Sequence, residues 1–181
     1  VCEPPEGRAA EWYISCDYGT VNPTSMGLWG RWGEAWYRVE EFYYDSRREG
    51  RQKTDSEYAD ALEALADGRP IREVVADPSA ASFLECLRRR GWQVRRAENE
   101  VLSGIRTTAE LLRTGRLVIC PGCGDAIQEF GLYRWDTSAG GRDQVCKEHD
   151  HAMDDIRYFA VTVAAKERGG SWAGSVERRI F

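Results

Sequence analysis

The segment 149–159, HDHAMDDIRYF, holds both histidines of the chain and three aspartates within seven residues. Residues that favour a helix follow it for two more turns. Carboxylates this close repel one another unless cations or hydrogen-bond donors neutralise them. The aspartates Asp150, Asp154 and Asp155 are therefore candidates for chemistry, with His151 beside them.

Two further aspartates follow apolar runs that predict buried strands. Asp17 ends the run in ISCDYG, and Asp77 ends the run in VVADPS, where Pro78 prevents the strand from continuing. In an open α/β sheet, the carboxyl ends of adjacent strands line the crevice where ligands bind. Several carboxylates gathered there would suit Mg²⁺ or Mn²⁺, and a pair of such ions is the usual means of phosphodiester hydrolysis. The alternative is that each aspartate only ends or caps its element.

Helical geometry alone does not decide which aspartate of the last helix is the third acid of such a cluster. Residues of the last helix follow one another at about 100°, which places Ala152, Ile156, Phe159 and Val163 on one apolar stripe. Asp154 points away from the centre of this stripe. Asp155 borders the buried face, so amphipathicity slightly favours Asp155.

The other two polar residues of this turn have simpler expectations. Asp150 is expected to be the N-cap, where the helix dipole favours a carboxylate, although a contact with a metal through water stays open. His151 lies three residues before Asp154 and can share its flank of the helix. It would contact a metal-bound water or the scissile phosphate, or hold a carboxylate; the alternative is a polar residue without a catalytic role.

The elements that would position these residues alternate between strand and helix. Aromatic and β-branched stretches broken by Gly or Pro predict strands, and apolar stripes that end at Gly predict helices. The predicted order is β, β, β, α, β, α, β, α, β, α, α. An antiparallel start followed by alternation indicates an α/β three-layer fold with a central mixed β-sheet flanked by helices. We expect this domain at 11–166, with a linker or tail at 1–10 and a C-terminal tail at 167–181.

The composition is that of an ordinary globular protein, with 42% hydrophobic and 30% charged residues in 181. No apolar run is long enough to cross a bilayer, so we expect an intracellular protein without a membrane partner. A Gly-Lys pair is absent from the sequence, which excludes the common phosphate-binding loop for ATP. The net charge of −5 argues mildly against nucleic acid, but positive charge is clustered at 47–53, 88–90 and 95–96.

Two further motifs bear on binding. RREGRQK (47–53) predicts a basic turn or hairpin in which Arg47, Arg48, Arg51 and Lys53 contact the DNA backbone, unless it is only a solvated surface. CPGC (120–123) with Cys146 and His149 has ligand types and spacings suited to structural zinc. Against zinc, Cys120 ends an apolar strand, and cysteine is commonly a small core residue.

Five segments in this order resemble the nuclease domain at the C-terminal side of the bacteriophage terminase large subunit. They are DYGTVNPTS, YYDSRREGRQKTDSEYADAL, ADPSAASF, NEVLSGI and DHAMDDIRY, and they cover about residues 12–165. The resemblance implies an RNase H-like fold and a metal-dependent endonuclease that cuts concatemeric phage DNA with little sequence specificity. The implied partners are double-stranded DNA, an N-terminal ATPase motor domain of the same polypeptide, the portal and the small terminase subunit, in the host cell cytoplasm.

The resemblance also bears on the site. The family pattern DHAMDAIRY aligns Asp154 with a catalytic aspartate and has Ala at the place of Asp155. It therefore implies that Asp17, Asp77 and Asp154 bind two divalent ions, Mg²⁺ or Mn²⁺, with His151 assisting. Three alternatives remain at this stage: a resolvase or transposase-type RNase H-like nuclease, a non-catalytic module that grips DNA or docks a motor, and a zinc-structured interaction domain.

Overall fold

The computed structural model describes residues 1–134 and 150–166. Within these ranges the chain forms a mixed six-stranded sheet with the strand order β5–β4–β1–β2–β3–β6. β1 is antiparallel to β2 and parallel to β4, and β3 is antiparallel to β2 and parallel to β6. Because β3 is reversed relative to β2, it runs in the same direction as β1, and the carboxyl ends of β1, β3 and β4 lie at one edge.

The elements follow the predicted order. The strands are β1 (Trp12–Asp17), β2 (Thr24–Trp32), β3 (Ala35–Tyr44), β4 (Ile71–Ala76), β5 (Val94–Arg96) and β6 (Leu117–Ile119). The helices are α1 (Asp55–Ala66), α2 (Ala81–Arg89), α3 (Val101–Arg113), α4 (Gly124–Leu132) and α5 (His151–Phe159), which continues as the π-helical segment η1 (Ala160–Ala164). Residues 46–50 form a turn between β3 and α1, so the basic segment is a turn and the hairpin alternative is wrong.

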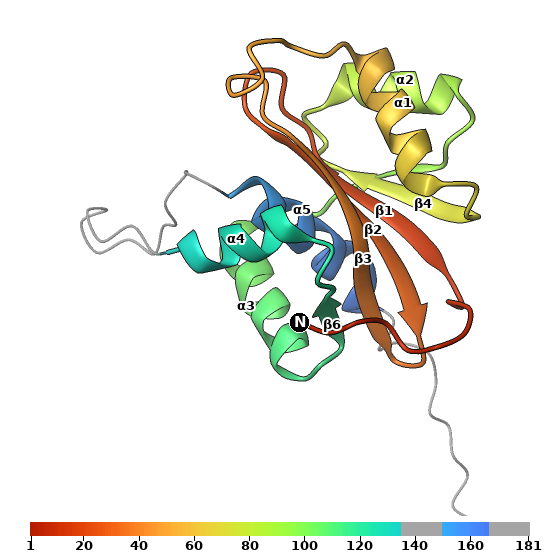
Figure 1. Ribbon diagram of the computed structural model, residues 1–181, viewed down its shortest axis with the longest axis vertical. Helices are drawn as coiled ribbons and strands as arrows, with labels where there is room; N and C mark the ends of the chain where they lie inside the picture. Colours follow the sequence, from red (N-terminus) through yellow and green to blue (C-terminus); the bar gives the residue numbers. More distant parts are fainter. Residues whose placement is uncertain (135–149, 167–181) are drawn as a thin grey trace, which may run out of the picture.

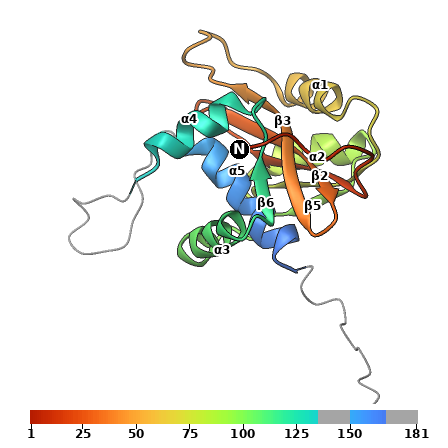
Figure 2. The same cartoon turned by 60° about the horizontal axis from the view of Figure 1, so that its bottom comes forward.

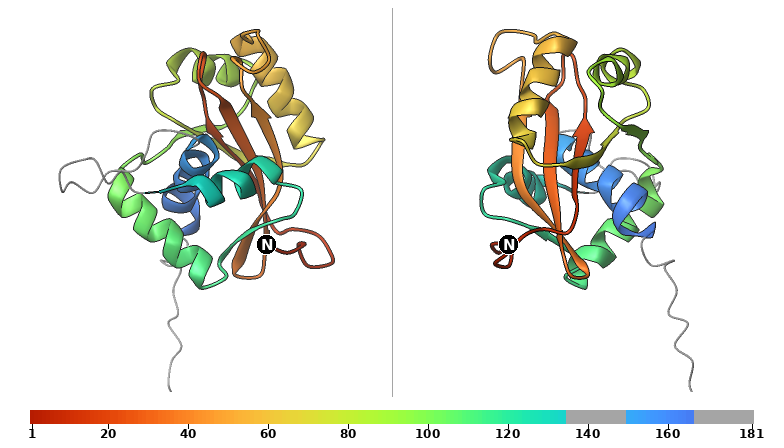
Figure 3. Two further views of the ribbon diagram at one scale, coloured as in Figure 1. Left: turned by 60° about the vertical axis from the view of Figure 1, so that its left-hand side comes forward. Right: turned by 90° about the vertical axis from the view of Figure 1, so that its right-hand side faces the viewer.

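The sheet separates two layers of helices, which confirms the predicted three-layer α/β fold (Figure 1). Side chains of a strand alternate between its two faces. Ile14 and Val74 therefore join the core under α1 and α2, whereas Tyr13 and Val75 join the core under α3, α4 and α5. The turned views show α5 beside both α3 and α4 on this second face (Figure 3).

The N-terminal residues run along the surface and end beside β6 (Figure 2). Residues 1–10 contain no helix or strand, although Ala10 N–H donates a hydrogen bond to the carbonyl of Arg31. Among the helices in the described ranges, none is both long and apolar enough to span a membrane.

A charged side chain lies in the middle of this fold. Arg38 of β3 is fully buried, with its guanidinium carbon 5.7 Å from the ring centre of Trp29. The guanidinium group reaches Gly27 of β2, where a Cβ atom would lie 1.9 Å from Nη1 of Arg38. The absence of a side chain at Gly27 thus makes room for the guanidinium group.

We expect Gly27→Ala to lower the free energy of unfolding by about 1–3 kcal/mol, because the added methyl group overpacks the site against a buried guanidinium. Gly131→Ala is the matched control, since no described atom lies within 4 Å of its Cβ position on α4. This control should be neutral or stabilising by up to about 1 kcal/mol. Urea unfolding followed by circular dichroism measures both; equal stability of the two variants would contradict the packing described for Arg38.

Candidate functional site

Two aspartates leave the sheet at the same edge. Asp17 is the last residue of β1, and Asp77 directly follows β4. These strands pair in parallel, with Cys16 opposite Ala76, so their ends are neighbours. The side chain of Asp17 turns toward the face covered by α5, where it is 15% exposed. The sheet thus places both acids on the rim where the sequence predicts them.

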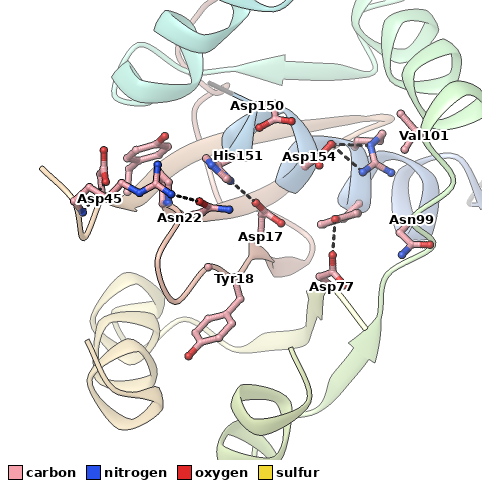
Figure 4. A pocket seen from close by; sticks show the side chains of 16 residues that line it. Asp17, Tyr18, Asn22, Asp45, Asp77, Asn99, Val101, Asp150, His151 and Asp154 are labelled. Carbon is pink, nitrogen blue, oxygen red and sulfur yellow. Dashed lines mark hydrogen bonds and ion pairs between the residues drawn. The ribbon is translucent and has the colours of Figure 1, made fainter. Parts of the chain in front are cut away.

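Helix α5 crosses this rim and supplies a hydrogen-bonding partner to each of the two acids (Figure 4). Nδ1 of His151 lies 2.9 Å from Oδ2 of Asp17. The hydroxyl of Tyr158 donates to Oδ2 of Asp77 at 2.7 Å. His151 and Tyr158 are seven residues apart, about two turns of α5, so both side chains lie on the same side of the helix.

Asp154 faces the same space from the helix. Its Oδ1 accepts hydrogen bonds from Nη2 and Nε of Arg157 at 2.9 and 3.1 Å, and its side chain is 14% exposed. Asp17, Asp77, Asp154 and His151 all line one cavity of about 650 Å³ (Figure 4). Its wall also contains Tyr18, Gly19, Asn22, Pro23, Tyr43, Asp45, Arg47, Asn99, Val101, Asp150, Arg157 and Tyr158.

Asp155 is not among the described residues that line this cavity. Its side chain is fully buried, where Oδ2 lies 2.7 Å from Nη1 of Arg38 and accepts a hydrogen bond from the hydroxyl of Ser25 at 2.9 Å. The helical geometry thus correctly predicts that Asp155 borders the buried face. The pairing of Asp155 with an internal cation argues against Asp155 as a metal ligand.

Burial shapes the charges of the rim. It raises the pKa of Asp17 to about 6, and the nearby carboxylates Asp154 and Asp155 add to this, although His151 opposes it. Burial also opposes ionisation of Asp77, but hydrogen bonds from Ser79 and Tyr158 outweigh it and lower the pKa of Asp77. Burial lowers the pKa of His151, yet its contact with Asp17 raises the pKa more, so the net direction is upward. The contact between Asp17 and His151 therefore favours the charged form of both side chains.

The donor set fits a hard divalent ion in type, since five aspartates line one cavity, the three predicted acids among them, and carboxylate oxygen is the ligand that Mg²⁺ and Mn²⁺ prefer. Within residues 1–134 and 150–166, however, no three His, Cys, Asp or Glu side chains are gathered closely enough to form a ready-made metal site. Each acid instead has its own protein partner: His151, Tyr158 or Arg157. An ion held by Asp154 would compete with the guanidinium of Arg157 for the same carboxylate.

Asp150 has the expected position but not the expected contact. It is the N-cap residue of α5, yet its side chain makes no capping hydrogen bond to a described residue. It lines the cavity instead. The backbone carbonyl of Asp150 accepts the first helical hydrogen bond, from Asp154 N–H at 2.8 Å.

The basic turn touches the cavity through one residue. Arg47 lines the wall, where its Nη2 donates to Oδ1 of Asn22 at 3.2 Å. Arg48 and Arg51 form exposed ion pairs with Glu49 and Glu57, and the ammonium group of Lys53 lies 4.6 Å from the ring centre of Tyr44. The turn therefore lies next to the cavity, with its positive charges on the surface.

Half of the predicted zinc motif, Cys146 and His149, lies outside the described residues. The other half is buried: burial raises the pKa of Cys120 to about 11 and that of Cys123 to about 12. The thiol of Cys123 also donates to the carbonyl of Arg38 at 3.2 Å. These surroundings favour the protonated thiol, which is not a zinc ligand.

Sequence reasoning missed several residues of the cavity wall, and three of them contact residues that it did select. Asp45 directly follows β3, so the rule that selects Asp17 and Asp77 would also select it once β3 is known to run parallel to β1. Its Oδ1 accepts from the N–H of Arg47 and thereby holds the basic turn. Arg157 is three residues after Asp154, a spacing that favours an ion pair on a helix. Tyr158 has no local signal, because its partner is 81 residues away.

Comparison with solved structures relates this chain to large terminases of bacteriophages. No protein-family model and no curated protein sequence matches the chain. The large terminase of the thermophilic bacteriophage D6E, solved with ADP, matches with a TM-score of 0.86 and 40% identity over 90% of this chain. The chain spans 42% of that protein's length.

Two solved nuclease domains have the same fold at lower identity. The nuclease domain of the large terminase g2p from bacteriophage SPP1, solved with bound Mn, matches with a TM-score of 0.64 and 18% identity over 86% of this chain and 87% of that one. The large terminase nuclease from thermophilic phage G20c, solved with bound magnesium, gives a TM-score of 0.67 and 18% identity over 90% and 92%. The predicted resemblance to large terminase nuclease domains is confirmed.

The two adjacent aspartates of α5 should differ sharply when each is replaced by asparagine. Asp155→Asn removes the nearer of the two carboxylates that pair with the buried Arg38 and leaves only Glu41, 3.3 Å from Nη2, so we expect a loss of about 3–5 kcal/mol in the free energy of unfolding. Asp154→Asn weakens the pair with Arg157 but also relieves the repulsion between Asp154 and Asp17, so it should cost less than the change at position 155. Urea unfolding in EDTA measures both, and a loss at position 155 no larger than at 154 would contradict the buried pair.

Asp17→Asn should stabilise the ion-free protein at neutral pH. The pKa of Asp17 is about 4 in the unfolded chain and is raised to about 6 in the folded protein. Between these two pH values the unfolded state ionises more readily than the folded state, so the Asp17 carboxyl lowers the free energy of unfolding as the pH rises. The variant should therefore gain about 1–3 kcal/mol at pH 8 and little at pH 3.5. Thermal melting in EDTA at the two pH values tests this, and a variant that is less stable than the parent at pH 8 would contradict it.

Proposed function

We propose, from the fold shared with large terminase nuclease domains, that this chain is a metal-dependent endodeoxyribonuclease domain of a phage DNA-packaging terminase. The observation that carries the proposal is the convergence of Asp17, Asp77 and Asp154 on one cavity. Two of these acids come from parallel strand ends and the third from a helix that crosses them. This arrangement brings together oxygen donors from three distant parts of the sequence.

In this proposal, Asp17, Asp77 and Asp154 hold two divalent ions, Mg²⁺ or Mn²⁺. When bound, such ions activate water and stabilise the leaving oxygen of a phosphodiester. His151 orients the carboxylate of Asp17 through its Nδ1 contact and holds a proton there. Tyr158 fixes Asp77 by donating to one oxygen, while the N–H of Ser79 donates to the other at 2.7 Å.

The proposed substrate is double-stranded DNA, cut with little sequence specificity. Arg47 is positioned to contact a phosphate because it lines the cavity. Arg48, Arg51 and Lys53 extend positive charge outward from it along the basic turn, and backbone contacts of this kind carry no sequence information. The proposed nuclease domain comprises residues 11–166, which contain all the helices and strands of the described fold.

The wider setting is also part of the proposal. The chain spans 42% of the D6E large terminase. In this proposal, an ATPase motor domain of the same polypeptide, the portal and the small terminase subunit, which the sequence resemblance implies, complete the machine. The place of action would be the host cell cytoplasm, where concatemeric phage DNA is packaged.

Nicking of supercoiled plasmid in Mn²⁺ tests this proposal. Asp77→Ala and Asp154→Asn should lower the rate by at least about 100-fold, because each removes an oxygen ligand from the ions. Asp60→Asn is the matched control, since this aspartate is exposed on α1 and pairs with Arg90 far from the cavity. Unchanged nicking by Asp77→Ala would sink the metal mechanism, and joined strand-transfer products would favour a transposase-type nuclease instead.

A further inference from the structure

The first turn of α5 needs hydrogen-bond acceptors from outside the helix. The first N–H groups of any helix have no partner within it. At α5 the usual supplier would be the side chain of Asp150, which makes no capping hydrogen bond to a described residue. The turn nevertheless carries His151 and Asp154, two of the residues on which the proposed function depends.

Glu129 of the neighbouring helix α4 supplies the acceptor. Its Oε2 accepts from the N–H of Ala152 at 2.7 Å and from the N–H of Met153 at 3.3 Å. Its Oε1 accepts from the hydroxyl of Tyr43 on β3 at 2.7 Å. The side chain is only 4% exposed, so both oxygens are used inside the protein. One carboxylate thus joins α4, α5 and β3.

The helix that carries Glu129 is anchored in the same way. Oε1 of Glu41, on β3, accepts from the N–H of Asp125 at 2.7 Å at the start of α4. Glu41 in turn lies 3.3 Å from Nη2 of the buried Arg38. A series of carboxylate caps therefore runs from the sheet through α4 to α5. It fixes where α5 begins relative to the sheet edge that carries Asp17.

We infer that Glu129 is a positioning residue that sets the first turn of α5 and thereby places His151 against Asp17 and Asp154 toward the cavity. His151 precedes Ala152, and Asp154 follows Met153, so the two capped N–H groups lie between the two functional side chains. Because Glu129 takes over the capping of this turn, the side chain of Asp150 can face the cavity. Glu129 itself is outside the cavity wall formed by the described residues. The inference rests on the proposed nuclease function.

The test compares Glu129→Ala and Glu129→Gln in the full 181-residue chain. Glutamine keeps one acceptor oxygen for the helix but loses the charge. We expect the cleavage rate constant in saturating Mn²⁺ to fall about 10- to 100-fold in the alanine variant and less in the glutamine variant, as for other residues that orient a site. The apparent KM for plasmid DNA should stay unchanged, because Glu129 does not contact the substrate.

A second readout reports on the cap itself. The amide resonances of Ala152 and Met153 in ¹⁵N-correlated NMR spectra should shift in both variants, and more in the alanine variant. If Glu129→Ala does not fold, the glutamine variant still decides: it should show shifted amides and a reduced rate constant. A glutamine variant with shifted amides and the parent rate constant would overturn the inference.

Leu65→Ala is the control for a loss of stability alone. Leu65 is buried in the core under α1 and α2, on the other face of the sheet from α5. It should lower the melting temperature while cleavage at 25 °C stays at the parent rate. An equal loss of cleavage in Leu65→Ala and Glu129→Ala would overturn the inference. Asp77→Ala distinguishes failure of the proposed nuclease function from failure of the inference about Glu129. Full cleavage activity in Asp77→Ala would contradict the proposed function. An inactive Asp77→Ala together with a fully active Glu129→Ala would contradict only the role of Glu129.

Discussion

The buried ion pair between Arg38 and Asp155 is the constraint on which the site depends. Neither side chain is exposed, and removing two charges from water is tolerable only when they are well paired and hydrogen-bonded. Ser25 completes the pair through Asp155, and Gly27 leaves the space that the guanidinium fills. This requirement fixes the rotation of α5 about its own axis. Since consecutive helical residues differ by about 100°, directing Asp155 inward turns Asp154 toward the cavity.

Helix α5, held in this orientation, contacts the acids along the sheet edge. His151, Arg157 and Tyr158 of α5 contact Asp17, Asp154 and Asp77, respectively, which are three of the acids that line the cavity. These contacts restrain the carboxylates but do not fully offset their burial and mutual repulsion, as the raised pKa of Asp17 indicates. Stability and function are therefore opposed at Asp17: the charge that suits a divalent ion is costly in its absence. Such opposition is common where a site must hold like charges together.

The sequence predicts the order of elements and the strand-end acids because those signals are local. Pro78 ends β4 directly after Asp77, and the apolar run before Asp17 ends at the same sheet edge. The apolar stripe of α5 likewise predicts that Asp155 borders the core. The partners are not predictable in this way, because Arg38, Tyr158 and Glu129 act on residues distant in sequence. Helical geometry alone left both Asp154 and Asp155 open as the third acid, because the position of Arg38 is not contained in any helical pattern.

Diffraction from a crystal of the chain soaked in Mn²⁺ would test the central claim most directly, because anomalous scattering locates the ions independently of any assumed ligand. The account predicts ions in the cavity, bound by carboxylate oxygens of Asp17, Asp77 and Asp154, with Asp154 drawn away from Arg157 and Asp155 still paired with Arg38. An empty cavity in saturating Mn²⁺, or an ion bound by Asp155 after that pair has broken, would contradict it.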